Sequence, residues 1–262
     1  MEIIINSLIA ICVAGLVFGL VLGYAGIKFK VTEDPILPLI KAALPGVNCA
    51  GCGYTGCASF AEAVLRGEAA PNSCPVGGET TVAALSKALG IEITARKRTV
   101  AAVKCGGDCQ KAKSLYIYEG MQSCEAAKML AGGGSKGCAY GCLGGGSCKA
   151  VCDFGAIEIV GGISVVKKEK CTACGKCIIV CPKEIIEMIP YAVKTKVLCN
   201  SKEKGKDVRE VCGVGCIACK LCEKACEAGA ILVKSQLAEI DYDRCTDCGS
   251  CEKKCPTKCI AS

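Results

Sequence analysis

The stretch CTACGKCIIVCP, residues 171–182, spaces its cysteines as C-x2-C-x2-C-x3-C and ends in proline. The same spacing returns in CIACKLCEKAC at residues 216–226 and in CTDCGSCEKKCP at residues 245–256. Three thiolates this close together can hold three irons of one [4Fe–4S] cube, while the fourth cysteine of the run reaches a neighbouring cluster. Such runs work in pairs, so the pattern predicts a carrier of single electrons.

The composition favours iron–sulfur clusters over other uses of cysteine. Of 262 residues, 27 are cysteine and none is histidine, which excludes Rieske centres, His-ligated haem and His-containing zinc sites. Disulfides suit short secreted chains, and zinc sites use two separated C-x2-C pairs, so neither fits contiguous cysteine triplets. With no tryptophan and four phenylalanines, the fold must depend largely on bound metal, and iron removal should unfold it.

The formal net charge of +7 counts every cysteine as neutral. A cluster held by four thiolates carries about two negative charges when oxidised, so five clusters would reverse the sign. Lysines within residues 167–170 and 202–206 would balance this charge, attract an acidic redox partner or form an ordinary solvated surface. Aromatic residues do not interleave with the basic ones, so no nucleic acid partner is expected.

Residues 3–27 carry no charge and are rich in Ile, Leu and Val. About 20 apolar residues span a bilayer as a helix, which predicts a transmembrane anchor at residues 1–30 that meets lipid through residues 3–27. A signal peptide would need a basic start, whereas this chain begins Met1-Glu2. Lys28 and Lys30 follow the span, which predicts a single-pass protein of the cell (inner) membrane with its clusters on the cytoplasmic side.

A different cysteine pattern, C-x2-C-x4-C-x16-C, follows the anchor. Its members are Cys49, Cys52, Cys57 and Cys74. Glycines among them let the backbone bend tightly around a bound group, which indicates one [4Fe–4S] cluster. Helices are expected at residues 58–66 and 80–89. We call residues 31–92 the four-cysteine domain.

Residues 93–192 are predicted to form a first ferredoxin-like module with an N-terminal insertion. A stretched cysteine run precedes two alternating β segments, 156–160 and 163–166, which flank Gly161-Gly162 and predict a hairpin. A cysteine run, a hairpin and a second cysteine run, in this order, are typical of a two-cluster ferredoxin. One cluster is expected on Cys138, Cys142, Cys148 and Cys181, and its partner on Cys152, Cys171, Cys174 and Cys177.

Residues 193–262 repeat this plan as a second module, with β segments at 230–233 and 237–241 between its two runs. One cluster is expected on Cys216, Cys219, Cys222 and Cys255, and the other on Cys226, Cys245, Cys248 and Cys251. The predicted fold is therefore α+β. It combines one N-terminal transmembrane helix, a small four-cysteine [4Fe–4S] domain and two tandem two-cluster ferredoxin-like modules, with five clusters on twenty cysteines.

Cysteines outside these groups form a weak internal repeat. Val-Lys-Cys at residues 103–105 precedes the first module's run, and Val-Leu-Cys at residues 197–199 precedes the second. A sixth cluster, a structural pair or plain buried thiols would each account for them. The roles left open are those of Cys105, Cys109, Cys124, Cys199, Cys212 and Cys259.

An N-terminal anchor, the motif N-C-x-G-C-G-x-x-x-C-x-x-[FY]-A at residues 48–61 and then ferredoxin repeats resemble the B subunit of the Rnf complex. That family belongs to the membrane ferredoxin:NAD oxidoreductase, an ion translocase. The standard B subunit has one ferredoxin module, so this chain looks like the longer clostridial type. The resemblance implies electron transfer from soluble ferredoxin to other Rnf-type membrane and peripheral subunits, which reduce NAD and translocate Na+ or H+.

No catalytic residue is expected in the chain itself. No G-x-G-x-x-G unit follows a strand, and without histidine no nucleophile–base arrangement can be argued. The alternatives are a related complex that reduces a redox-sensing transcription factor, a membrane-tethered zinc-binding module, and a polyferredoxin that serves a hydrogenase or formate dehydrogenase. The coupling ion, the order and potentials of the clusters, the docking face for ferredoxin and the direction of net electron flow stay open.

Overall fold

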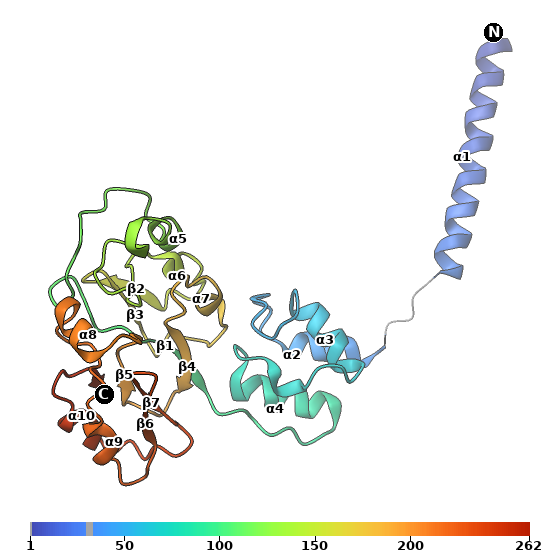
Figure 1. Ribbon diagram of the computed structural model, residues 1–262. Coiled ribbons are helices and arrows are strands. Elements are labelled where there is room, and N and C mark those ends of the chain that lie inside the picture. Colours follow the sequence, from blue (N-terminus) through green and yellow to red (C-terminus); the bar gives the residue numbers. More distant parts are fainter. Residues whose placement is uncertain (1, 30–33) are drawn as a thin grey trace.

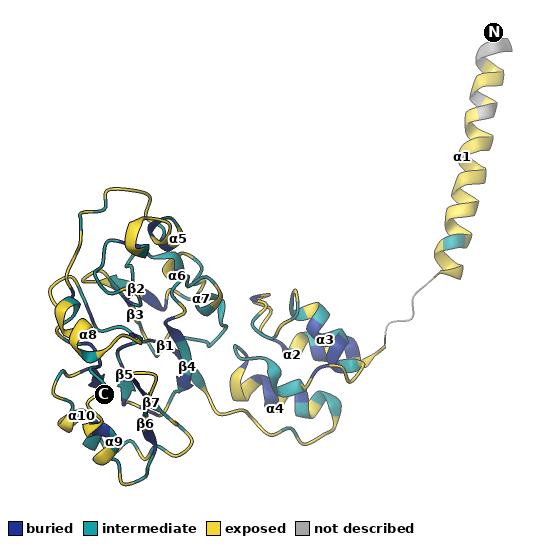
Figure 2. Cartoon of the chain, in the orientation of Figure 1, coloured by how far each residue is buried: buried dark blue, intermediate teal, exposed yellow. Residues whose placement is uncertain are grey.

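The computed structural model describes residues 2–29 and 34–262 (Figure 1). Helix α1 (Glu2–Lys28) is long and apolar enough over Ile5–Lys28 to cross a membrane, and none of that stretch is buried in the protein. Figure 2 shows it exposed along nearly its whole length. Lys30 and the predicted start of the four-cysteine domain lie outside the described residues. An uncovered apolar helix of this length suits a bilayer, where its backbone groups are satisfied internally.

The four-cysteine domain is built from short helices around a core of large apolar side chains. Its elements are α2 (Ile36–Ala43), α3 (Cys57–Leu65), the 3-10 turn η1 (Pro71–Ser73) and α4 (Gly78–Leu89). Ile40, Phe60 and Leu85, one from each α-helix, are at most 1% exposed. The two expected helices are thus confirmed, each beginning one or two residues earlier than predicted.

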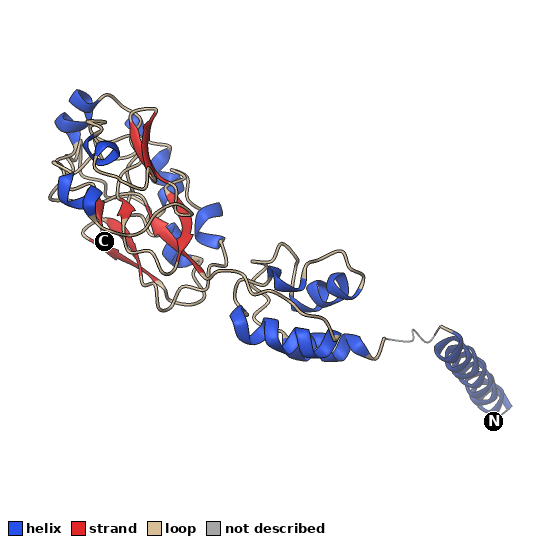
Figure 3. Ribbon diagram, turned by 90° about the horizontal axis from the view of Figure 1, so that it is seen from below, coloured by secondary structure: helices blue, strands red, loops and turns tan. Residues whose placement is uncertain are grey.

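Each module contains two antiparallel two-stranded sheets, drawn in red in Figure 3. The strands are β1 (Thr99–Val103), β2 (Ile157–Val160), β3 (Ile163–Val166) and β4 (Ile186–Pro190) in the first module, and β5 (Lys196–Val197), β6 (Ile231–Lys234), β7 (Leu237–Ile240) and β8 (Ile260–Ala261) in the second. In each module the opening strand pairs with the closing strand, β1 with β4 and β5 with β8, and both expected hairpins, β2–β3 and β6–β7, form between them.

Short helices carry one cysteine each at five places in the modules, namely Cys124, Cys148, Cys177, Cys222 and Cys251. The short helices are α5 (Cys124–Lys128), the 3-10 turn η2 (Ala131–Gly133), α6 (Ser147–Ala150) and α7 (Lys176–Ile179) in the first module, and α8 (Gly205–Val211), α9 (Leu221–Lys224) and α10 (Ser250–Lys254) in the second. The module cores mix cysteines with a few aliphatic side chains. Cys142, Cys148 and Cys177 lie among the first set, and Cys216, Cys222 and Cys259 among the second. Bound metal would therefore sit inside the cores.

The two modules pack directly against each other. Tyr242 of the second module lies against Val100 and Ile189 of the β1–β4 sheet. The ammonium group of Lys168 donates to the carbonyl of Val193 at 2.8 Å, across the junction of the two ranges. The four-cysteine domain approaches the first module through a glycine, because a Cβ added to Gly51 would lie 3.0 Å from both Cα and O of Cys174.

Candidate metal centres

In the four-cysteine domain, the predicted cysteines gather at the edge of the apolar core. Cys49 is buried, and Cys52, Cys57 and Cys74 pack against the core residues. The Cys57 amide donates to Oδ1 of Asn48 at 2.8 Å, which fixes the start of α3. Burial raises the pKa of Cys74, while the backbone amides of Gly77 and Val76 hydrogen-bond to its sulfur.

Each module has two cysteine-lined cavities, and we call the one that contains the first three cysteines of the module's second run the outer cavity and the other the inner cavity. The outer cavity of the first module has a volume of about 340 Å³. Its cysteines are Cys152, Cys171, Cys174 and Cys177, the four expected to share one cluster. Backbone amides point at the sulfurs, from Ala101 to Cys171 and from Ala156 to Cys152, each at 3.4 Å. Burial raises the pKa of Cys177 to about 12, so iron must displace the thiol protons when it binds.

The second module has two cysteine-lined cavities. Its outer cavity, about 340 Å³, contains Cys226, Cys245, Cys248 and Cys251. Its inner cavity, about 290 Å³, contains Cys216, Cys219, Cys222 and Cys255. Ala230 donates its amide to Cys226 at 3.3 Å, as Ala156 does to Cys152 in the first module. Both groups coincide with those predicted from the crossed spacing.

The inner cavity of the second module also contains a fifth thiol. Cys259, 2% exposed, places its sulfur 3.5 Å from that of Cys255 and also hydrogen-bonds to Cys216. Its hydrogen bond lowers the pKa of Cys255 to about 5, and the pKa of Cys259 itself is raised. Cys259 therefore lies within hydrogen-bond reach of two predicted ligands.

The inner cavity of the first module, about 330 Å³, differs from the predicted group. Its cysteines are Cys124, Cys142, Cys148 and Cys181, so Cys124 takes the place expected for Cys138. A Cβ at Gly145 would lie 2.8 Å from the Cys124 amide nitrogen, and only glycine permits this approach. Ser147 Oγ accepts the Cys124 amide at 2.9 Å and holds it there.

Cys138 lies instead in another cavity, of about 350 Å³, between the two modules. We call it the bridging cavity. Its other cysteines are Cys105, Cys199 and Cys212, three whose roles the sequence left open. The stretched spacing around Cys138 and Cys142 reflects this division, because the two residues face different cavities. The glycine run 144–146 was the available signal for Cys124, since it leaves room for a segment from elsewhere in the chain.

All five cavities have sulfur-lined walls and similar sizes, between 290 and 350 Å³. Within residues 2–29 and 34–262, no group of three His, Cys, Asp or Glu side chains converges tightly enough to hold a single metal ion. The cysteines instead surround a volume, and a four-iron cube occupies such a volume with its irons at the surrounding thiolates. The residues present therefore fit [4Fe–4S] clusters.

Profiles of known families match three parts of the chain. They are described as a putative Fe-S cluster at residues 44–76, a 4Fe-4S binding domain at 164–187 and a 4Fe-4S dicluster domain at 215–259. These matches concern iron–sulfur clusters, which favours the electron-transfer interpretation over a tethered zinc module.

Curated relatives match nearly the whole chain. The B subunit of the Na(+)-translocating ferredoxin:NAD(+) oxidoreductase complex of Acetobacterium woodii is 48% identical over 95% of this chain and 75% of its own length. The B subunit of the ion-translocating oxidoreductase complex of Methanosarcina acetivorans is 44% identical over 99% of this chain and 98% of its own. The chain belongs to the family of Rnf complex B subunits.

A third Rnf relative, the B subunit of the proton-translocating ferredoxin:NAD(+) oxidoreductase complex of Clostridium ljungdahlii, is 41% identical over 99% of this chain and 93% of its own length. These relatives confirm the predicted resemblance, including its extent along the whole chain. The Rnf B subunit is an electron-transfer component of an oxidoreductase complex, and the matched 4Fe-4S domains agree with that role.

Proposed function

We propose that this chain accepts electrons from reduced soluble ferredoxin and relays them through [4Fe–4S] clusters toward membrane subunits that reduce NAD and translocate Na+ or H+. When bound, each cluster would supply reversible one-electron chemistry. The ligands would be the cysteines of the four-cysteine domain and those of the inner and outer cavities of both modules. Cys124 replaces Cys138 in the first inner group.

The observation that carries this proposal is the single-file arrangement of the cysteine groups. Gly51 brings the loop of the four-cysteine domain against Cys174 in the first outer cavity. Cys177 of that cavity and Cys148 of the first inner cavity lie in the same buried core cluster. The Cys142 and Cys216 amides, from the two inner cavities, hydrogen-bond to Cys105 and Cys199 between them. These contacts lead from the four-cysteine domain through the first module to the inner cavity of the second module.

The second module is the proposed docking end for ferredoxin. Cys219 and Cys248 are exposed, whereas the cysteines of the first module's two cavities are buried or half-buried. Exposed lysines surround α9 and α10; they are Lys220, Lys224, Lys253, Lys254 and Lys258. A basic rim around accessible ligands favours encounter with an acidic redox protein.

The four-cysteine domain is the proposed end nearer the membrane, because it follows α1 directly in the chain. Lys28 in the last turn of α1 supports an orientation with all cysteine groups on the cytoplasmic side. The coupling ion lies outside this subunit's own residues, and the relatives named above differ in it.

The test mixes anaerobically purified full-length protein with chemically reduced [4Fe–4S] ferredoxin and follows the visible absorbance of both. Ferredoxin should be reoxidised as the chain is reduced, and Lys253→Glu with Lys254→Glu should slow this several-fold and weaken its salt dependence. Arg96→Glu with Lys97→Glu is the matched control, a two-charge reversal at exposed positions away from α10.

The control pair should react like the parent protein. Recovery of stoichiometric zinc without sulfide, or ferredoxin that stays reduced in the presence of iron-loaded protein, would refute the proposed function.

A further inference from the structure

The bridging cavity is built from both modules. Cys105 follows β1 and Cys138 lies in the loop before α6, whereas Cys199 follows β5 and Cys212 follows α8. Backbone hydrogen bonds join the two sides, from Gly106 to Leu198 and from Lys113 to Val211, each at 2.9 Å. Ala112 also forms an isolated β-bridge with Cys212. The four sulfurs are therefore brought together by the contact between modules.

Its backbone amides are arranged as in the other cavities. The sulfurs of Cys105, Cys138 and Cys199 each accept a hydrogen bond from the amide two residues further on, at Gly107, Tyr140 and Ser201. The same relation holds at predicted ligands in other cavities, from Lys176 to Cys174, from Ala218 to Cys216 and, at 3.4 Å, from Asp247 to Cys245. Hydrogen bonds to ligand sulfurs stabilise their charge.

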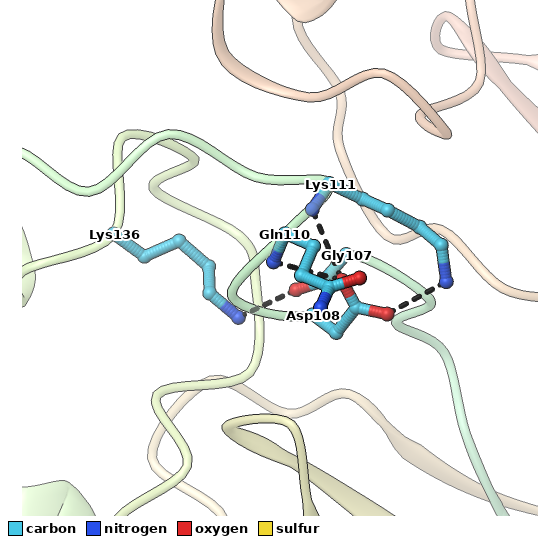
Figure 4. A network of polar contacts seen from close by, with 5 residues as sticks. All are labelled: Gly107, Asp108, Gln110, Lys111 and Lys136. Carbon is cyan, nitrogen blue, oxygen red and sulfur yellow. Dashed lines mark hydrogen bonds and ion pairs between the residues drawn. The ribbon is translucent and has the colours of Figure 1, made fainter.

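Polar contacts hold the loop after Cys105 in place, as Figure 4 shows. Lys136 Nζ donates to the Gly107 carbonyl at 2.8 Å, and Asp108 Oδ1 accepts the amides of Gln110 and Lys111, each at 3.0 Å. A Cβ at Gly107 would lie 3.1 Å from Cys212 Sγ and 4.0 Å from Cys105 Sγ. Glycine thus keeps the space beside two sulfurs free of side-chain atoms.

The charges around the cavity suit an anionic group. Lys104 and Lys136 are among its lining residues, and neither Asp nor Glu is among the lining residues that the structure describes. Four thiolates with a [4Fe–4S] core carry a net negative charge, which Lys136 would offset, whereas the Lys104 ammonium group already pairs with Glu187 at 3.4 Å. At about 350 Å³ the cavity is as large as those of the predicted cluster sites.

We propose that Cys105, Cys138, Cys199 and Cys212 bind a sixth [4Fe–4S] cluster that connects the two modules. The proposal rests on the proposed function, since it assumes that the other cysteine groups bind clusters of the same type. The matched family profiles do not include residues 77–163 or 188–214, where these four cysteines lie. The site stands between the two inner cavities, so one-electron transfer from the second module to the first would pass through it.

The first measurement is the iron, sulfide and zinc content of the anaerobically purified full-length protein. Six clusters predict about 24 iron and about 24 sulfide per chain, against about 20 of each for five clusters. This count decides the proposal without any variant, so it holds even where a substitution prevents folding.

The second measurement compares Cys105→Ser with Cys199→Ser, combined in one chain, against Cys109→Ser. Cys109 is exposed in the same insertion and lines none of the five cavities. The double variant should lose about one sixth of its iron and sulfide, and Cys109→Ser should lose none. After mixing with reduced ferredoxin, EPR of the double variant should show second-module clusters reduced and first-module clusters still oxidised.

The possible failures can be told apart. About 20 iron atoms per chain in both the parent protein and the double variant would refute the sixth cluster. If both proteins also oxidise the added reduced ferredoxin, the proposed function still stands. One zinc per parent chain, lost in the double variant, would make the bridging cavity a zinc site. Absence of iron and sulfide from the parent would refute the proposed function itself.

Discussion

The two modules share one strand plan and differ in how they build the inner cavity. The second module takes three of its cysteines from the contiguous run 216–222, and Cys219 of that run is exposed. The first module has a glycine loop there and brings in Cys124, which is buried, from its insertion. The difference teaches that an insertion can shield a site by replacing the ligand that would otherwise face solvent.

Helix α7 of the first module and helix α10 of the second also differ in their exposed side chains. Ile179, two residues after Cys177 on α7, is 88% exposed. The corresponding residue on α10, two after Cys251, is Lys253. A charged surface suits a transient partner that arrives by diffusion, whereas an exposed isoleucine suits a lasting contact. This difference agrees with the docking of ferredoxin that we propose at the second module.

The largest expected difference between the modules is in iron loss. Under anaerobic treatment with a chelator, the second module should lose iron and unfold first, because Cys219 and Cys248 are exposed. Limited proteolysis with mass spectrometry would detect this as cleavage within residues 193–262 before cleavage within 93–192. Simultaneous cleavage of both ranges would mean that the insertion gives no protection.

A smaller effect, the loss of one site, should follow from Cys124→Ser. The variant should lack one cluster, about four iron, as Cys219→Ser should in the second module. Cys109→Ser, at an exposed cysteine of the same insertion, provides the control for each. Full iron content in Cys124→Ser would favour the grouping first expected from spacing, with Cys138 as the fourth ligand.

The smallest expected effect is on the reduction potentials of the two inner sites, through hydrogen bonds to their cysteines. Ser164 Oγ lies 3.0 Å from Cys148 Sγ, whereas Ala238 occupies the matching position on β7. Because a donor stabilises the more negative reduced state, Ser164→Ala should lower that site's potential by about 20–60 mV, the equivalent of one hydrogen bond. EPR-monitored redox titration measures this shift.

The reciprocal substitution, Ala238→Ser, should raise the potential of the second inner site by a similar amount. The second inner cavity already has a fifth thiol, Cys259, 3.5 Å from the sulfur of Cys255, where the first module has Ile185. Unchanged potentials in both variants would show that these hydroxyl positions do not distinguish the modules.

Much of this arrangement could be predicted because its signals are local. Cysteine runs and flanking β segments lie within a few residues of each other, so spacing alone indicated both hairpins and three of the four cavity groups within the modules. The four-cysteine domain's helices were found by the same local signals. The anchor was predicted from a continuous apolar stretch, and α1 agrees with it.

The rest depends on contacts between distant segments. Cys124 reaches its cavity because Gly145 has no Cβ, which would lie 2.8 Å from the Cys124 amide nitrogen, and spacing does not encode that approach. Spacing alone therefore assigns Cys138 to the nearer run. The bridging cavity needed the packing of two modules, which brings Cys105 and Cys199 together although their own runs lie elsewhere.

Each cavity in the modules takes cysteines from distant parts of the chain. This also sets the order in which the cavities are completed during synthesis on the ribosome. The four-cysteine domain has all its cysteines once Cys74 has emerged, but the first inner cavity must wait for Cys181 and the bridging cavity for Cys212. The second inner cavity waits for Cys255. The cysteine groups would thus be completed first in the four-cysteine domain, then in the first module and last in the second, and a nascent chain would hold unpaired thiols that need protection from oxygen until the later segments arrive.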